Sequence, residues 1–153
     1  MSFVVNPVAY VHNDRKTISD DFWGSVVSEI RLTDAFPAAA LDGLDSFSHA
    51  EIIFLFDKAA DTAIVTGASH PRGNPQWPQV GIFAQRKKDR PNHIGLTTCE
   101  IVERRENSLF VRGLDAIDGT PVLDIKPVLK EFLPRTTVQQ PAWSAELMKD
   151  YWK

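Results

Sequence analysis

Short runs of β-prone residues, separated by turn-forming residues, dominate this chain and constrain what it can fold into. No internal repeat or low-complexity tract interrupts the pattern. Many short strands divided by turns are typical of a β-sandwich or a β-barrel. The expected strands cover residues 3–11, 26–32, 47–56, 62–66, 80–84, 97–104 and 109–114.

Two parts of this pattern predict specific pairings. The apolar run Ile52–Phe56 is unbroken, which predicts a central strand with both faces covered. Residues 97–104 and 109–114 alternate in hydrophobicity around Glu106 and Asn107, which predicts a hairpin.

Helical signals are few. A short helix is expected over residues 36–41. At the other end, Trp143, Leu147 and Tyr151 recur at spacings of four residues. This spacing predicts an amphipathic helix over residues 142–152 that docks on the barrel or on a second subunit. With 153 residues, we expect one domain that spans residues 1–153.

Composition limits the possible partners. The net charge is −3, so the chain is not a globally basic nucleic-acid binder, and any RNA contact needs a local patch. A single cysteine, Cys99, excludes an internal disulfide and a multi-cysteine zinc site. The four histidines lack metal-ligand spacing, so no metal is expected. No apolar run reaches the ~20 residues of a membrane span and no secretory signal is visible, so we expect a cytoplasmic protein.

Residues 115–127 read D-A-I-D-G-T-P-V-L-D-I-K-P and are unusually dense in acids, turn formers and prolines. The pair Asp118-Gly119 can turn the chain, because glycine tolerates a positive φ. Pro121 and Pro127 each fix φ and remove a backbone donor. The pattern predicts a rigid acidic loop suited to a polar small molecule.

Residues 81–96 read G-I-F-A-Q-R-K-K-D-R-P-N-H-I-G-L and carry four cations close together. Arginine forks fit carboxylates and phosphates, and lysines act as point charges. From composition alone, a solvated basic turn followed by a strand is the favoured interpretation. Glycine-rich phosphate loops and the hydrolase nucleophile motif are absent from the chain.

Taken together, these segments resemble the TsaA-like, or TrmO-type, family. The matching motifs are G-I-F-A-Q-R, R-P-N-H-I-G-L and G-L-D-A-I-D-G-T-P-V-L-D-I-K-P, in this order. Residues 8–11, residues 41–49 and the tail from Trp143 to Trp152 also fit, so the resemblance covers essentially the whole chain.

The resemblance implies a mainly β fold: a small antiparallel β-barrel with short helices and a C-terminal helix, which forms a homodimer. It implies that S-adenosylmethionine (SAM) is the cofactor. The implied activity is methylation of the exocyclic amine of a modified adenosine beside the tRNA anticodon. Two alternatives remain: a methyltransferase with a small-molecule acceptor, and a non-catalytic SAM-binding module.

The resemblance also suggests roles for individual residues. Asp124 is the candidate catalytic carboxylate that accepts a proton or orients the amine; equally, it pairs with Lys126 or Arg90 and only holds the loop. The candidate cofactor-binding residues are Asp57, Lys58, Arg86, Leu96, Asp118, Gly119, Thr120 and Pro121. The candidate substrate and phosphate contacts are Lys87, Lys88, Arg90 and Asn92.

The chain departs from the family pattern at several positions near the expected cofactor pocket. Glu51 stands where the family has tryptophan, and Asp57 stands where it has histidine. An early P-R-Q loop of the family is replaced by D-F-W-G at residues 21–24. These changes predict a remodelled pocket and bear on the acceptor more than on the cofactor.

Overall fold

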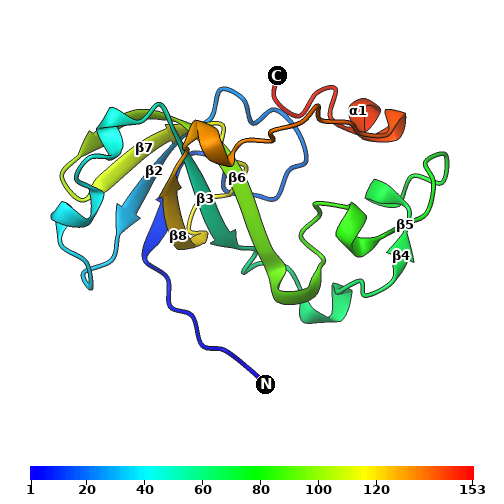
Figure 1. Ribbon diagram of the computed structural model, residues 1–153. Helices are drawn as coiled ribbons and strands as arrows, with labels where there is room; N and C mark the ends of the chain where they lie inside the picture. The colour runs from blue at the N-terminus through cyan, green and yellow to red at the C-terminus, as the bar shows by residue number, and fades with distance from the viewer.

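The computed structural model describes residues 1–153 and shows a closed antiparallel barrel with an arm at one side (Figure 1). The barrel order is β1-β2-β7-β6-β3-β8. Its strands are β1 (Ala9–His12), β2 (Val27–Leu32), β3 (His49–Leu55), β6 (Ile94–Arg105), β7 (Ser108–Arg112) and β8 (Pro121–Pro127). The predicted barrel is therefore confirmed.

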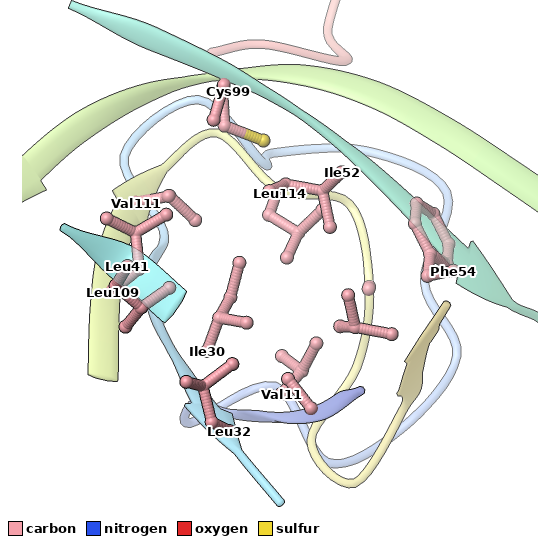
Figure 2. Close-up of a cluster of buried hydrophobic side chains, with 14 residues drawn as sticks. Val11, Ile30, Leu32, Leu41, Ile52, Phe54, Cys99, Leu109, Val111 and Leu114 are labelled. Atoms are coloured by element: carbon pink, nitrogen blue, oxygen red, sulfur yellow. The ribbon is translucent and has the colours of Figure 1, made fainter. Parts of the chain in front are cut away.

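Buried and exposed residues alternate along the strands, so one face of each strand packs into the interior of the barrel. In β2, Ser28, Ile30 and Leu32 are buried while their neighbours are not. The labelled core side chains converge inside the ring of strands, and Leu114 closes it from the segment after β7 (Figure 2). The predicted hairpin is confirmed: β6 and β7 pair around a turn at Glu106, whose φ is 52°.

Strand β3 is central, as predicted, because it pairs with both β6 and β8. Only its inner face is fully buried, however. Ala50, Ile52 and Phe54 point into the core, whereas Ile53 and Leu55 are half-buried. In a closed barrel the outer face of every strand remains accessible, so the expectation of two covered faces is wrong.

The acidic segment 115–127 is only partly a loop. Residues 115–120 form a connection, and Pro121–Pro127 is strand β8, which pairs with β1 and β3. The two prolines occupy its ends, where a missing donor costs little. A register shift of β8 against Ile53 and Phe54 accompanies the polar residues in mid-strand.

Residues 66–90 form the arm. Its only strands are the two-residue pair β4 (Ala68–Ser69) and β5 (Val80–Gly81). The strand expected over 80–84 is thus mostly wrong, since Ile82–Ala84 is a 3-10 turn, η5. The strand expected over 62–66 does not form: η3 (Asp61–Ala63) takes up its first residues, and no neighbouring strand offers a hydrogen-bonding ladder.

The remaining elements are short. The expected helix at 36–41 is the 3-10 turn η1 (Ala38–Leu41). The strand expected over 3–11 begins only at Ala9, as β1, because residues 1–7 pair with no other strand. The C-terminal helix α1 covers Ala142–Leu147 only. The other 3-10 turns are η2 (Leu44–Ser46), η4 (Pro71–Gly73), η6 (Pro91–His93) and η7 (Lys130–Phe132). None of the helices is long and apolar enough to cross a membrane.

Candidate functional site

A cleft of about 1180 Å³ lies between the barrel, the arm and the C-terminal tail. Figure 1 shows β6, the β4–β5 arm and α1 on the same side of the molecule, the arm and α1 both lying to the right of β6. Pockets that hold small ligands usually measure about 300–1,000 Å³. This cleft therefore has room for a nucleotide-sized molecule and a second reactant.

The barrel wall of the cleft is the first half of β6 and the end of β3. Gly95 lets the ring of Phe54 lie against the backbone, because a Cβ at this position would stand 2.5 Å from that ring. On the outer side of the strand, Ile94 and Leu96 are 46% and 43% exposed. They present apolar surface to the cleft.

The arm is fixed by a buried glutamine. The Nε2 of Gln85 donates to the carbonyl oxygens of Ser69 (3.2 Å) and Val80 (3.0 Å), and so ties β4 to β5. Arg90 donates to the carbonyl of Gln85 at 2.6 Å, and the guanidinium of Arg86 reaches the Leu96 carbonyl on β6. These bonds hold the basic segment against the barrel and along the cleft.

The C-terminal tail forms the third wall. The backbone amides of Phe22 and Trp23 donate to the carbonyl oxygens of Asp150 (3.1 Å) and Tyr151 (2.8 Å). These bonds, together with a turn after Met148, explain why the predicted helix stops at Leu147. The indole of Trp77 on the arm donates to Glu146 at 3.1 Å, so the tail bridges the arm and the 21–24 loop.

A carboxylate with two hydroxyl donors lies at the floor of the cleft. Thr97, on the inner face of β6, donates to Oδ1 of Asp115, and Tyr151 of the tail donates to Oδ2. Burial, followed by the charge of Asp115 and this hydrogen bond, raises the pKa of the Tyr151 hydroxyl far above its usual range. Burial and the same charge raise the pKa of Cys99 to about 12, which leaves it an inert core thiol, as the sequence predicted.

Cations line one rim of the cleft, and several are already paired. Lys88 lies 3.4 Å from Asp89, and Lys58 lies 3.5 Å from Asp57. Arg72 holds Asp21 at 2.9 Å. The basic rim is therefore partly neutralised, and its side chains are orientated by their neighbours.

Eight of the residues predicted from the sequence line this cleft, although they are far apart in the chain. They are Asp57, Lys58, Arg86, Lys87, Lys88, Arg90, Leu96 and Thr120. The structure thus brings the basic segment and the end of β3 together. Their individual roles stay predictions.

Five predicted residues do not line the cleft: Asn92, Asp118, Gly119, Pro121 and Asp124. Asp118 instead accepts from the backbone amide of Asn13 at 3.1 Å and pairs with Lys16 at 2.9 Å. These contacts, Lys16 first, lower the pKa of Asp118. Asn92, at φ 65°, forms the turn that returns the chain to β6.

Asp124 lies on the barrel wall beside a smaller hollow of about 380 Å³, which is lined mainly by apolar residues such as Phe36 and Phe47. Its carboxylate pairs with Lys126 at 2.8 Å, one of the two pairings that the sequence left open. The catalytic role given to Asp124 stays an untested prediction.

Sequence reasoning missed the residues that shape the floor and walls of the cleft. Asp115 belongs to the acidic segment 115–127, but the candidate roles in that segment were assigned to Asp118 and Asp124. Tyr151 was assigned only to a helix face, and Gln85 was not singled out at all. No group of three or more histidine, cysteine or acidic side chains is placed to hold a metal ion.

Comparison with known proteins identifies the family. Residues 16–132 match the family model described as the tRNA-methyltransferase O N-terminal domain. The chain belongs to this family. The resemblance seen in the sequence is therefore confirmed.

Several relatives have related names. The chain is 37% identical over 105 residues to the human tRNA (adenine(37)-N6)-methyltransferase, and this match spans 69% of the chain but 23% of the human protein. It is 37% identical over 134 residues to a probable S-adenosyl-L-methionine-binding protein of Methanothermobacter thermautotrophicus, which covers 86% of the chain and 93% of that protein. The chain thus spans less than a quarter of the human relative and nearly all of the archaeal one.

Solved structures agree with the barrel. A crystal structure of TrmO from Pseudomonas aeruginosa superposes with a TM-score of 0.76 at 26% identity, over 95% of this chain and 63% of that one. A second TrmO crystal structure gives a TM-score of 0.74 at 27% identity, over 92% and 64%. The fold described above is the fold of these structures.

Proposed function

We propose that this chain is a SAM-dependent methyltransferase that modifies the exocyclic amine of a tRNA adenosine near the anticodon. The observation that carries the proposal is the cleft, which gathers the basic segment, the end of β3 and a hydrogen-bonded carboxylate in one place. Family membership and the names of the relatives support the same activity.

The residues of the cleft fit SAM by their chemistry. SAM presents a flat adenine, a carboxylate and two positive centres. Leu96 and Phe83 offer exposed apolar surface for the adenine. Arg86 and Lys58 are suited to the carboxylate, and Asp57 adds negative charge for a positive centre.

When bound, SAM supplies a methyl group that its sulfonium activates for transfer. The chain contributes binding and orientation. The rigid arm and the docked tail fix the walls between which two reactants meet. An amide-like nitrogen is a poor nucleophile, so holding it in line with the methyl group supplies much of the rate.

The acceptor assignment rests on the basic rim. Lys87, Lys88 and Arg90 lie beside the cleft and are suited to the phosphates of a nucleic acid. The proposal includes a cytoplasmic location, since a tRNA substrate would be met there. Because the net charge is −3, such binding depends on this local rim and should weaken steeply as salt rises.

Mass analysis of tRNA nucleosides from a deletion strain tests the acceptor, with purified protein, SAM and tRNA as the complementary assay. Loss of one methylated adenosine in the strain, and its restoration in vitro, is expected. The double variant Lys87→Gln with Lys88→Gln should weaken tRNA binding without changing SAM affinity. An unchanged set of methylated nucleosides would exclude tRNA.

A second candidate is a small-molecule acceptor. The acidic residues Asp20, Asp57 and Asp115 line the same cleft, and the cations are partly neutralised. Salt-insensitive methyl transfer to a small amine, without tRNA binding, would support this candidate. A non-catalytic SAM-binding module would instead bind SAM and methylate nothing.

The proposal includes a homodimer. Residues 131–141 run exposed between β8 and α1, and they carry the apolar side chains Phe132, Leu133 and Val138, which are 80%, 46% and 66% exposed. Apolar side chains exposed along one segment offer surface that a partner can bury. A second copy of the chain is the occupant that we propose, and sedimentation of the purified protein measures it.

A further inference from the structure

The floor of the cleft carries an arrangement that the proposed roles leave unused. Asp115 follows β7 and reaches the cleft beside Thr97 of β6 and Tyr151 of the tail. Three segments far apart in sequence therefore converge on one carboxylate. Asp57 pairs with Lys58 and Asp124 pairs with Lys126, whereas Asp115 has no cation as a direct partner.

We propose that Asp115 is the catalytic carboxylate that accepts the proton of the acceptor nitrogen, and that Tyr151 is the residue that positions it. This inference rests on the proposed methyltransferase function. It assigns the proton-accepting role to Asp115 in place of Asp124, which lies outside the cleft.

The hydrogen-bonding capacity of Asp115 supports this role. A carboxylate has about four lone-pair positions. The two hydroxyls occupy one position on each oxygen, so one position on each remains. A substrate N–H in the cleft can therefore donate to Asp115 without breaking either existing bond.

The groups beside Asp115 hold their own protons. Its charge contributes to the raised pKa of both Tyr151 and Cys99, so both neighbours stay protonated near neutral pH. The charges of Arg72 and Arg86 lower the pKa of Tyr151, but burial and the charge of Asp115 outweigh them. Tyr151 thus remains a donor throughout the working range of the site.

Methyl transfer and proton removal together leave a neutral product nitrogen. The lone pair of the acceptor nitrogen forms the new N–CH₃ bond while the bond between methyl carbon and sulfur breaks, and the sulfur keeps that electron pair as a neutral thioether. The nitrogen gives its proton to the free position on Asp115, which releases it to water afterwards. General-base help of this kind contributes about 10²–10⁴-fold in rate.

The test compares Asp115→Asn, Tyr151→Phe and the control Tyr10→Phe, since Tyr10 is the only other tyrosine and lies on β1. SAM affinity is measured by calorimetry, and single-turnover methyl transfer is measured across pH with tRNA and with a small amine. Asp115→Asn should leave SAM affinity within about threefold and lower the rate about 100-fold or more, with the acidic limb of the pH profile lost.

Tyr151→Phe should lower the rate by about tenfold and move the acidic limb to higher pH, because the carboxylate loses a donor to its charged form. In the Tyr10→Phe background, absorbance of the remaining tyrosinate should appear at lower pH once Asp115→Asn removes the nearby charge. That readout needs no turnover. Tyr10→Phe alone should match the wild type in SAM affinity, rate and pH profile.

Three results would overturn the inference: an active wild type with an equally active Asp115→Asn variant, a loss of rate explained entirely by weaker SAM binding, or a Tyr151→Phe pH profile that coincides with the wild type. A wild type that binds SAM and methylates neither acceptor overturns the proposed function and this inference with it. If Asp115→Asn unfolds, the Tyr151→Phe profile alone decides.

Discussion

The missing side chain of Gly24 lets the C-terminal tail lie against the 21–24 loop. A Cβ at this position would overlap the backbone carbonyl of Trp152, which cannot move without breaking the bond between Trp23 and Tyr151. Gly24→Ala is therefore expected to destabilise the protein by about 1–3 kcal/mol and to loosen the tail. Urea unfolding and limited proteolysis of the tail measure the two effects.

Gly67→Ala is the matched control, because nothing lies within 4 Å of a Cβ at Gly67. It should leave both measurements unchanged or slightly improve stability. A Gly24→Ala variant as stable and as protease-resistant as the control would show that the tail does not depend on this contact.

Asp118 makes the stability of the fold depend on pH in the acidic range. Lys16 first, and then the backbone amide of Asn13, lower its pKa below the usual 3.8. A carboxyl whose pKa is lower in the folded state than in the unfolded state stabilises the fold at any pH above the unfolded-state pKa. This contribution disappears as pH falls through the folded-state pKa. Because the side chain is partly exposed, we expect about 1 kcal/mol at most from the ion pair.

Asp118→Asn should thus be less stable than the wild type at pH 7, and the difference should shrink at an acidic pH below the usual carboxyl value of 3.8. Urea unfolding at both pH values measures this difference. Asp14→Asn is the control from the same loop, since Asp14 is exposed. A gap between wild type and Asp118→Asn that persists or widens in acid would contradict the assignment.

At the level of elements, the arm depends on Gln85 more than on its strands. Three contacts from its Nε2, to the Ser69 carbonyl, the Ser69 hydroxyl and the Val80 carbonyl, bind together strands of only two residues each. Gln85→Leu leaves the half-buried carbonyls of Ser69 and Val80 without this donor and is expected to cost about 1–3 kcal/mol.

The cost should fall on the arm. Amide exchange should speed up in residues 66–84 while the barrel strands keep their protection, and SAM affinity should weaken because the basic rim is no longer held. Gln76→Leu, at an exposed site on the same arm, should change neither property. Uniform acceleration across the barrel would show that the arm and the barrel unfold as one unit.

The elements also show what the sequence can and cannot reveal. Alternation predicted β2 and the β6–β7 hairpin, because each strand has one buried face. Strand β8 was hidden because prolines and charges suggested a loop, and only pairing with β1 and β3 makes it a strand. The docking of Tyr151 on Asp115 joins residues 36 positions apart, and no local pattern encodes it.

On the scale of the whole molecule, the cleft assembles from segments whose positions the barrel fixes. The basic segment was recognisable from its composition and its place in the family motif, and it does line the cleft. The floor was not recognisable, since the contacts of Thr97 and Tyr151 with Asp115 exist only in the folded chain. Local chemistry was therefore easier to predict than the long-range contacts that orientate it.

The exposed strap of residues 131–141 gives a prediction about assembly. Phe132 and Leu133 are exposed and do not pack against the core of their own chain. In the proposed homodimer, the second copy buries them. The double variant Phe132→Ser with Leu133→Ser should weaken the dimer by about tenfold or more, because aromatic anchors dominate interface energies. Sedimentation equilibrium over a range of concentrations measures the change. Val4→Ser removes an exposed apolar side chain outside the strap and should leave the dimer intact. Dissociation by Val4→Ser alone would place the interface at the N-terminal segment, and a double variant that dimerises like the wild type would remove the strap from the interface.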